Sequence, residues 1–115
     1  MSPSTRIALS LGLTFTAAAC GGGEVPAKQL GEAESAIRAA SEVGAENNAQ
    51  ASLHLKMAKD HFAEAQAASK DGEQESAKLL LEKAEADAEL ALALTRKEQA
   101  SAKAEEAKEK LQPQR

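Results

Sequence analysis

The chain has 115 residues, a net charge of −4, 2% aromatic residues and a single cysteine, and alanine is its commonest residue. This length corresponds to one domain. An acidic balance with no basic cluster argues against binding nucleic acid, or anionic lipid, through electrostatics. The abundance of alanine, glutamate, lysine and leucine is typical of long helices, and alanine buries too little surface to build a large core.

The amino-terminal segment, residues 1–19, has the organisation of a secretory signal. One positive side chain, Arg6, precedes an apolar run of roughly 13 residues that ends in three alanines before Cys20. A membrane-spanning helix needs about 20 apolar residues, so the run is too short to span a bilayer. We therefore predict residues 1–19 to be a signal peptide. Its removal would take away Arg6 and no acidic residue, which changes the net charge from −4 to −5.

The sequence Ala17-Ala18-Ala19-Cys20 resembles the bacterial lipobox, in which small residues precede an invariant cysteine. The resemblance implies that a diacylglyceryl group joins the Cys20 thiol, that cleavage occurs before Cys20, and that the new amino terminus is acylated. Several acyl chains would anchor the protein firmly in a lipid bilayer, whereas one chain anchors weakly. Gly21 stands where aspartate favours the inner membrane in enteric lipoproteins, which implies the outer membrane, facing the periplasm. The alternative is an ordinary secretory signal that leaves a free thiol at Cys20, an unusual feature in an oxidising compartment.

Residues 20–25, with three consecutive glycines, are predicted to be a lipidated cysteine and a flexible tether to a helical domain over residues 26–111. The first predicted helix spans residues 26–43. Pro26 suits its first position and Gly44 its carboxyl-terminal cap.

The second and third predicted helices are separated by a turn over residues 69–72. The second helix begins near Asn47 or Asn48, and the third begins at Asp71 or Gly72. Two pairs at the right spacing resemble capping boxes; these are Asn47 with Gln50 and Asp71 with Gln74.

Each predicted helix has apolar residues at three- and four-residue spacing, which marks the face that packs on the other helices. These residues are Leu30, Ala33, Ile37 and Ala40 in the first, Ala51, Leu55, Ala58, Phe62 and Ala65 in the second, and Ala77, Leu81, Ala84, Ala88 and Ala91 in the third. The third helix has further leucines, which predict that other helices cover it on several sides. They are Leu79, Leu80, Leu90, Leu92 and Leu94.

The third helix has no breaker before Pro113, so it extends for about 60 Å. Beyond Arg96 it becomes polar and keeps only a thin apolar stripe of Ala100, Ala104, Ala107 and Leu111. We predict that this end projects from the bundle, either to pair with another copy or as a solvated helix end. The expected fold is all-α, an antiparallel three-helix bundle with two short helices packed on a long, projecting third helix, followed by a disordered tail over residues 112–115.

Two side-chain groups are candidates for chemistry. His54, Met57 and His61 share one helical face, and imidazole with thioether suits copper(I); the alternative is that they flank the apolar stripe at the rim of the core. The carboxylates of Glu82, Glu85, Asp87 and Glu89 alternate with lysines and are expected to form a solvated face. No motif for a nucleophile, a phosphate loop or a cofactor is present. We expect no enzyme activity, cofactor or small-molecule substrate.

Three families share features with this chain. Residues 27–103, and above all Phe62–Ala68 through Asp71-Gly72 to Ala84–Ala91, resemble a family of uncharacterised, alanine-rich helical bacterial lipoproteins whose domain often precedes an OmpA-type domain. No OmpA-type domain follows, so cell-wall binding by that route is not implied. The spacing of Gly72, Ala77, Leu81 and Ala84 is similar to one tetratricopeptide hairpin. The chain also resembles murein lipoprotein, but the terminal lysine that links that family to peptidoglycan has no counterpart at Arg115.

The leading interpretation is a membrane-anchored structural or adaptor lipoprotein of the cell envelope that reaches toward a protein partner or another copy. The alternative is a peptide- or protein-docking module with a groove between the second and third helices.

Overall fold

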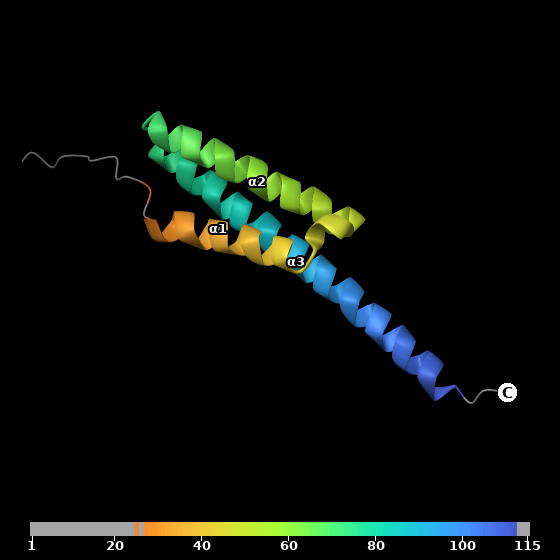
Figure 1. Ribbon diagram of the computed structural model, residues 1–115. Coiled ribbons are helices and arrows are strands. Elements are labelled where there is room, and N and C mark those ends of the chain that lie inside the picture. Colours follow the sequence, from red (N-terminus) through yellow and green to blue (C-terminus); the bar gives the residue numbers. More distant parts are fainter. Residues whose placement is uncertain (1–24, 26, 113–115) are drawn as a thin grey trace, which may run out of the picture.

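The computed structural model describes residue 25 and residues 27–112. The predicted signal peptide, Cys20 and the last three residues of the predicted tail lie outside this range. The helices are α1 (Ala27–Glu42), a short 3₁₀ helix η1 (Ala45–Asn47), α2 (Ala49–Lys70) and α3 (Gln74–Leu111). α1 and α3 run in the same direction, and α2 runs antiparallel to both (Figure 1). The predicted all-α, antiparallel three-helix bundle is confirmed.

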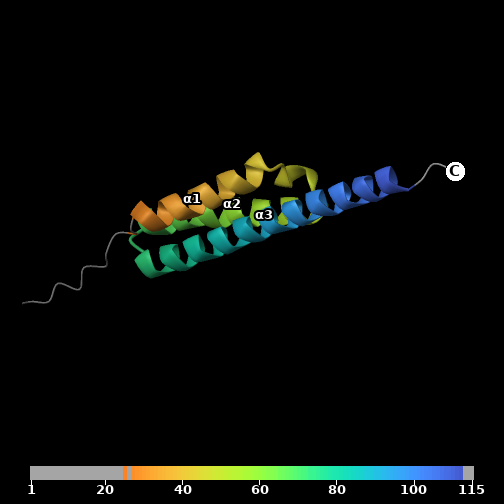
Figure 2. The ribbon, with the colours of Figure 1, turned by 90° about the horizontal axis from the view of Figure 1, so that it is seen from below.

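α3 is the helix that holds the bundle together. It contacts both α1 and α2 extensively, whereas α1 and α2 contact each other much less. At 38 residues it is also the longest element. Its last part continues beyond the other two helices (Figure 2), and every residue from 96 to 112 is exposed. We call residues 96–111 the arm; its predicted projection from the bundle is confirmed.

The core consists almost entirely of alanine. Within residues 25 and 27–112, three of the buried apolar residues are larger than alanine: Val25, Leu55 and Leu81. They form two clusters toward the two ends of the bundle, one around Leu81 and one around Leu55. The packing faces read from the sequence are confirmed, since the stripes of α2 and α3 are buried except for the half-buried Phe62.

The extra leucines of α3 are only partly covered. Leu80, Leu92 and Leu94 are half-buried against the two clusters. Leu79 and Leu90 are 53% and 42% exposed, so the expectation that helices cover α3 on several sides is wrong for them. Among the described α-helices only α1 and α2 pack on α3, so the opposite face of α3 is left without a neighbouring helix.

The corner between α1 and α2 is built around Gly44. Its φ of 86° is left-handed, and its N–H donates to the Ser41 carbonyl at 3.0 Å, as a helix-ending glycine does. The cap of α2 is Asn48, whose side-chain oxygen accepts from the Ala51 N–H at 2.7 Å. The predicted capping box at Asn47 is therefore wrong, because Asn47 belongs to η1.

The corner is also tied to the start of the arm. Gln99 donates from Nε2 to the Val43 carbonyl at 3.0 Å, and the Asn48 side-chain amide hydrogen-bonds to Glu98. These contacts fix the direction in which the arm leaves the bundle.

The turn between α2 and α3 differs from the predicted capping box at Asp71. Asp71 ends α2, and Gly72 adopts a left-handed φ of 81°. The Gly72 N–H donates to the Ser69 carbonyl and the Glu73 N–H to the Ala68 carbonyl, which together make a Schellman motif. α3 then begins at Gln74 with no side-chain cap.

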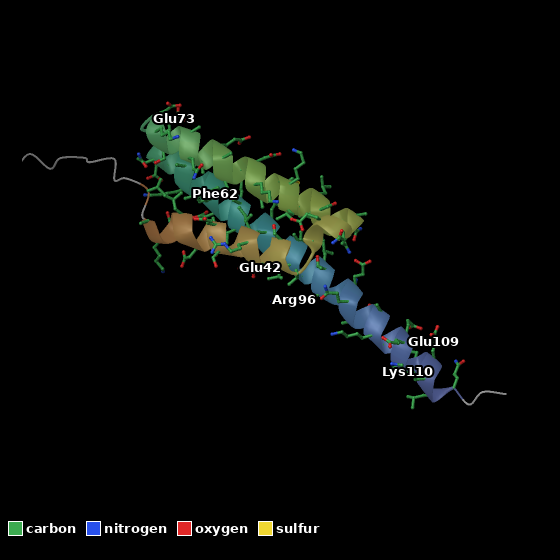
Figure 3. All side chains as sticks on the ribbon, viewed as in Figure 1. Glu42, Phe62, Glu73, Arg96, Glu109 and Lys110 are labelled. Atoms are coloured by element: carbon green, nitrogen blue, oxygen red, sulfur yellow. The ribbon has the colours of Figure 1, made fainter. Side chains whose placement is uncertain are left out.

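Gln74 joins this turn to the beginning of the bundle. Its Oε1 accepts from the Val25 N–H at 2.9 Å, and its Nε2 donates to the Ser69 carbonyl at 3.2 Å. The chain therefore enters the bundle at the end formed by the α2–α3 turn. Figure 3 labels Glu73 at this end and Glu42 and Arg96 at the opposite end, where the arm begins.

Two exposed glycines provide a matched test of the backbone. An added Cβ would meet no atom within 4 Å at Gly72 or at Gly31, but only Gly72 has a positive φ. We expect Gly72→Ala to lower the free energy of unfolding by about 1 kcal/mol. Gly31→Ala, inside α1, should raise it by about 0.5–1 kcal/mol because alanine favours the helix. Urea denaturation measures both, and changes of the same sign would contradict the turn geometry.

Candidate functional site

The most organised polar group in the bundle joins α2 to α3. Asp87 of α3 lies between His54 and His61 of α2. Its Oδ1 is 2.9 Å from His54 Nδ1, and its Oδ2 is 3.7 Å from His61 Nε2. The first distance is a hydrogen bond, and the second is too long for one.

The position of Asp87 follows from the antiparallel arrangement. Residues equally far from the α2–α3 turn face each other across the two helices. Gly72 is 15 residues before Asp87, 18 after His54 and 11 after His61, so the carboxylate falls between the two rings. This signal was present in the sequence once the turn had been located.

The predicted solvated acidic face is correct only in part. Glu82 and Glu89 are exposed, whereas Glu85 is half-buried. The side chain of Asp87 is 16% exposed, so this residue is wrongly placed among the solvated acids. A carboxylate at this depth needs partners, and the two imidazoles provide them.

The second histidine is less well satisfied than the first. His61 Nδ1 is buried and has no hydrogen-bond partner within the described residues. The nearest acid on its own helix is Glu64, whose Oε2 is 3.9 Å away. His54 therefore makes the closer contact with α3, and His61 makes a longer polar contact with the same carboxylate.

The copper candidates His54, Met57 and His61 all lie on α2. Both histidines turn toward the carboxylate of Asp87, and Met57 is 38% exposed. Among residues 25 and 27–112, no group of three or more His, Cys, Asp or Glu side chains is arranged to hold a metal ion. A hard carboxylate oxygen between the rings is not the environment that copper(I) prefers. The arrangement favours a polar link between two helices.

Apolar side chains also gather in a shallow groove beside this polar group, which we call the α2–α3 groove. Its walls are Leu53 and His54 from α2 and Leu90 and Leu94 from α3, with Gln50 at its margin. Leu53 is 57% exposed. The sequence suggested a groove between these helices but did not identify Leu53 as part of it.

A second shallow groove lies between α1 and α3. Both helices contribute small or apolar residues and charged ones, among them Gly31, Ala36, Glu85 and Glu89. A larger share of the lining is therefore polar than in the α2–α3 groove.

Within the described part of the chain, none of the helices combines the length and the apolar character needed to cross a bilayer. Cys20, the predicted lipidation site, lies outside the described residues.

One comparison with known proteins identifies a family. Residues 28–107 match the model of a family described as a domain of unknown function, DUF4398. The chain belongs to this family. The match covers α1, α2 and α3 as far as residue 107, so most of the arm is part of the family's domain. No curated protein and no solved structure matches the chain significantly.

The link through Asp87 can be tested by substitution. We expect Asp87→Ala to lower the free energy of unfolding by about 1–2 kcal/mol, because His54 loses its partner in a half-buried site. Asp87→Asn should cost less, since the amide keeps the shape and one acceptor oxygen.

The matched control for Asp87 is Asp60→Ala, which removes an exposed carboxylate that pairs only with Lys56 on its own helix. Its effect should stay below about 0.5 kcal/mol. Urea denaturation monitored by circular dichroism measures all three variants. Equal effects of Asp87→Ala and Asp60→Ala would contradict a stabilising role for the link.

Proposed function

We propose that this protein is a non-catalytic lipoprotein of the bacterial cell envelope, anchored through an acylated Cys20 and acting as a structural or adaptor element. The proposal places it on the outer membrane, facing the periplasm. It is supported by the segment from Met1 to Cys20, with its single positive charge, its short apolar run and its three alanines before the cysteine.

The observation that best supports this role is that the chain enters the bundle at one end and the arm leaves it at the other. The chain enters at Val25, which hydrogen-bonds to Gln74 at the α2–α3 turn. The arm leaves from the opposite end (Figure 1). An anchor at Cys20 would therefore sit at one end of the molecule, and the exposed arm at the other.

The lengths of the two parts fit this arrangement. Residues 20–25 reach at most about 18 Å when fully extended. The 38 residues of α3 extend about 57 Å. A lipid at Cys20 would hold the bundle close to the bilayer while leaving most of the surface of the arm available to another protein.

A peptide- or protein-docking module is the second candidate, and the α2–α3 groove favours it. The exposed apolar side chains of Leu53 and Leu90 flank this groove. If docking there is the function, Leu53→Ser should abolish capture of an envelope protein in a crosslinking experiment. A structural role that depends on the arm predicts no effect of Leu53→Ser.

Fatty-acid labelling in a bacterial host tests the anchor. The wild-type chain should take up the label and sediment with membranes, whereas Cys20→Ala should remain unlabelled. Gly21→Ala is the matched control and should be labelled as the wild type is. A wild-type protein whose mass shows an unmodified Cys20 thiol, or a Cys20→Ala variant that still takes up label, would refute lipidation.

The sorting signal has its own test. Gly21→Asp should move the labelled protein toward the inner-membrane fraction in an enteric host, because aspartate at this position retains lipoproteins there. Equal distribution of the wild type and Gly21→Asp between the two membranes would refute the proposed outer-membrane location without affecting lipidation.

A further inference from the structure

α3 has a second stripe on the face opposite the bundle. We call it the outer stripe; its residues follow one another at alternating steps of four and three. They are Leu79, Lys83, Ala86, Leu90, Ala93, Lys97, Ala100, Ala104, Ala107 and Leu111, and all of them are exposed. At 100° per residue, Ala86 points about 200° away from the buried Ala84.

This spacing is that of the two core positions of a coiled-coil heptad; the residues at these positions are leucine or alanine except for Lys83 and Lys97. The pattern runs without a break from the segment of α3 inside the bundle into the arm. Inside the bundle, α1 and α2 cover the other face of α3. Beyond the contacts of Glu98 and Gln99 with the α1–α2 corner, no other described helix lies beside the arm, and Glu109 and Lys110 lie near its far end (Figure 3).

We propose that the outer stripe pairs with the outer stripe of a second copy of this chain, with the two α3 helices antiparallel. Each arm then packs along the bundle segment of α3 in the other copy. This inference does not rest on lipidation of Cys20, since every residue it uses lies in α3.

Charges beside the outer stripe decide the partner and the direction. The residue before every second stripe position is charged, as is Glu75 one heptad before Glu82, and the sign changes halfway along the helix. These residues are Glu75, Glu82 and Glu89 in the first half, and Arg96, Lys103 and Lys110 in the second. Such flanking positions face each other across an antiparallel pair and set its orientation.

The full overlap of two antiparallel α3 helices matches every acid with a base. Glu75 faces Lys110 of the second copy, Glu82 faces its Lys103, and Glu89 faces its Arg96. Each contact occurs twice because of the two-fold symmetry.

Most of these charges are available for such contacts. Of the six, Glu75 is 3.3 Å from Lys78, and Lys110 is 2.6 Å from Glu106 on its own helix. Within residues 27–112, the other four have no ion-pair partner within 4 Å.

The same register also matches the sizes of the stripe residues. Four kinds of layer form, each twice because of the two-fold symmetry, and each places a long side chain against an alanine. The layers are Leu79 with Ala104, Lys83 with Ala100, Ala86 with Lys97, and Leu90 with Ala93. A long side chain against a small one fills a close helix–helix contact without voids. The lysine stems lie on the alanine surface while their ammonium groups reach water.

A parallel pair would be unfavourable both in its side-chain layers and in its flanking charges. It would place Lys83 against Lys83 and Lys97 against Lys97 in the centre of the interface. In a parallel coiled coil, each flanking residue faces the residue five positions further along the partner. Lys103 would then face Lys108.

Disulfide crosslinking tests the register. The full chain carries Cys20→Ser, so the introduced thiol is the only one. When Lys83→Cys and Ala100→Cys proteins are mixed and oxidised, we expect a mixed dimer, and neither protein alone should crosslink. Ala107→Cys, equally exposed and one heptad further on, replaces Ala100→Cys as the control and should react at least tenfold less.

Each other outcome of the crosslinking overturns the proposal. Crosslinking of Ala100→Cys with itself would indicate a parallel pair. Equal yields with Ala100→Cys and Ala107→Cys would indicate contact without register, such as association through the apolar residues 7–19. Absence of any crosslink would indicate that the outer stripe does not bind a second copy.

A charge exchange tests the flanking contacts. Replacing Glu82 and Glu89 by lysine should weaken self-association in sedimentation equilibrium by about tenfold. Adding Arg96→Glu and Lys103→Glu in the same chain should restore it, because both altered contacts then pair opposite charges again. All four residues are exposed, so helical content should remain unchanged. A fourfold variant that associates no better than the double variant would overturn the antiparallel register.

Discussion

Close contact of alanine with alanine along α3 is the interaction on which the bundle depends. Ala77, Ala84, Ala88 and Ala91 let two helices approach one helix closely, because small side chains shorten the distance between helix axes. The small size of alanine also limits the apolar area that each contact removes from water. The bundle therefore relies on polar additions between its elements, such as the bond from Val25 to Gln74 and the link from Asp87 to His54.

The sequence was a good guide to the packing faces and a poor guide to the helix ends. The alternation of three and four identified nearly every buried residue of α2 and α3, because burial follows the period of the helix. The caps failed at Asn47 and Asp71, where a shift of one or two residues changes which group the backbone bonds to. Gln74 had the spacing of a capping residue, yet it bonds to Val25, a partner 49 residues away that no local pattern reveals.

The sequence also misjudged two surfaces of α3. Asp87 was grouped with Glu82 and Glu89 because all three are acidic, but only the pairing across the α2–α3 turn shows that Asp87 faces α2. Leu79 and Leu90 were expected to be covered because leucine usually is. They are exposed because, among the described α-helices, α1 and α2 alone pack on α3 (Figure 2).

The parallel course of α1 and α3 has a mechanical consequence. Tension between the chain before Val25 and the tip of the arm would pull the beginning of α1 away from the end of α3. Since α1 and α3 run in the same direction, this load would act along their interface as shear, and all contacts between them would resist together. A force that pulls the beginning of α2 sideways from α3, at the end opposite their common turn, would instead peel contacts one after another. The bundle is therefore built to bear force along its length better than across it.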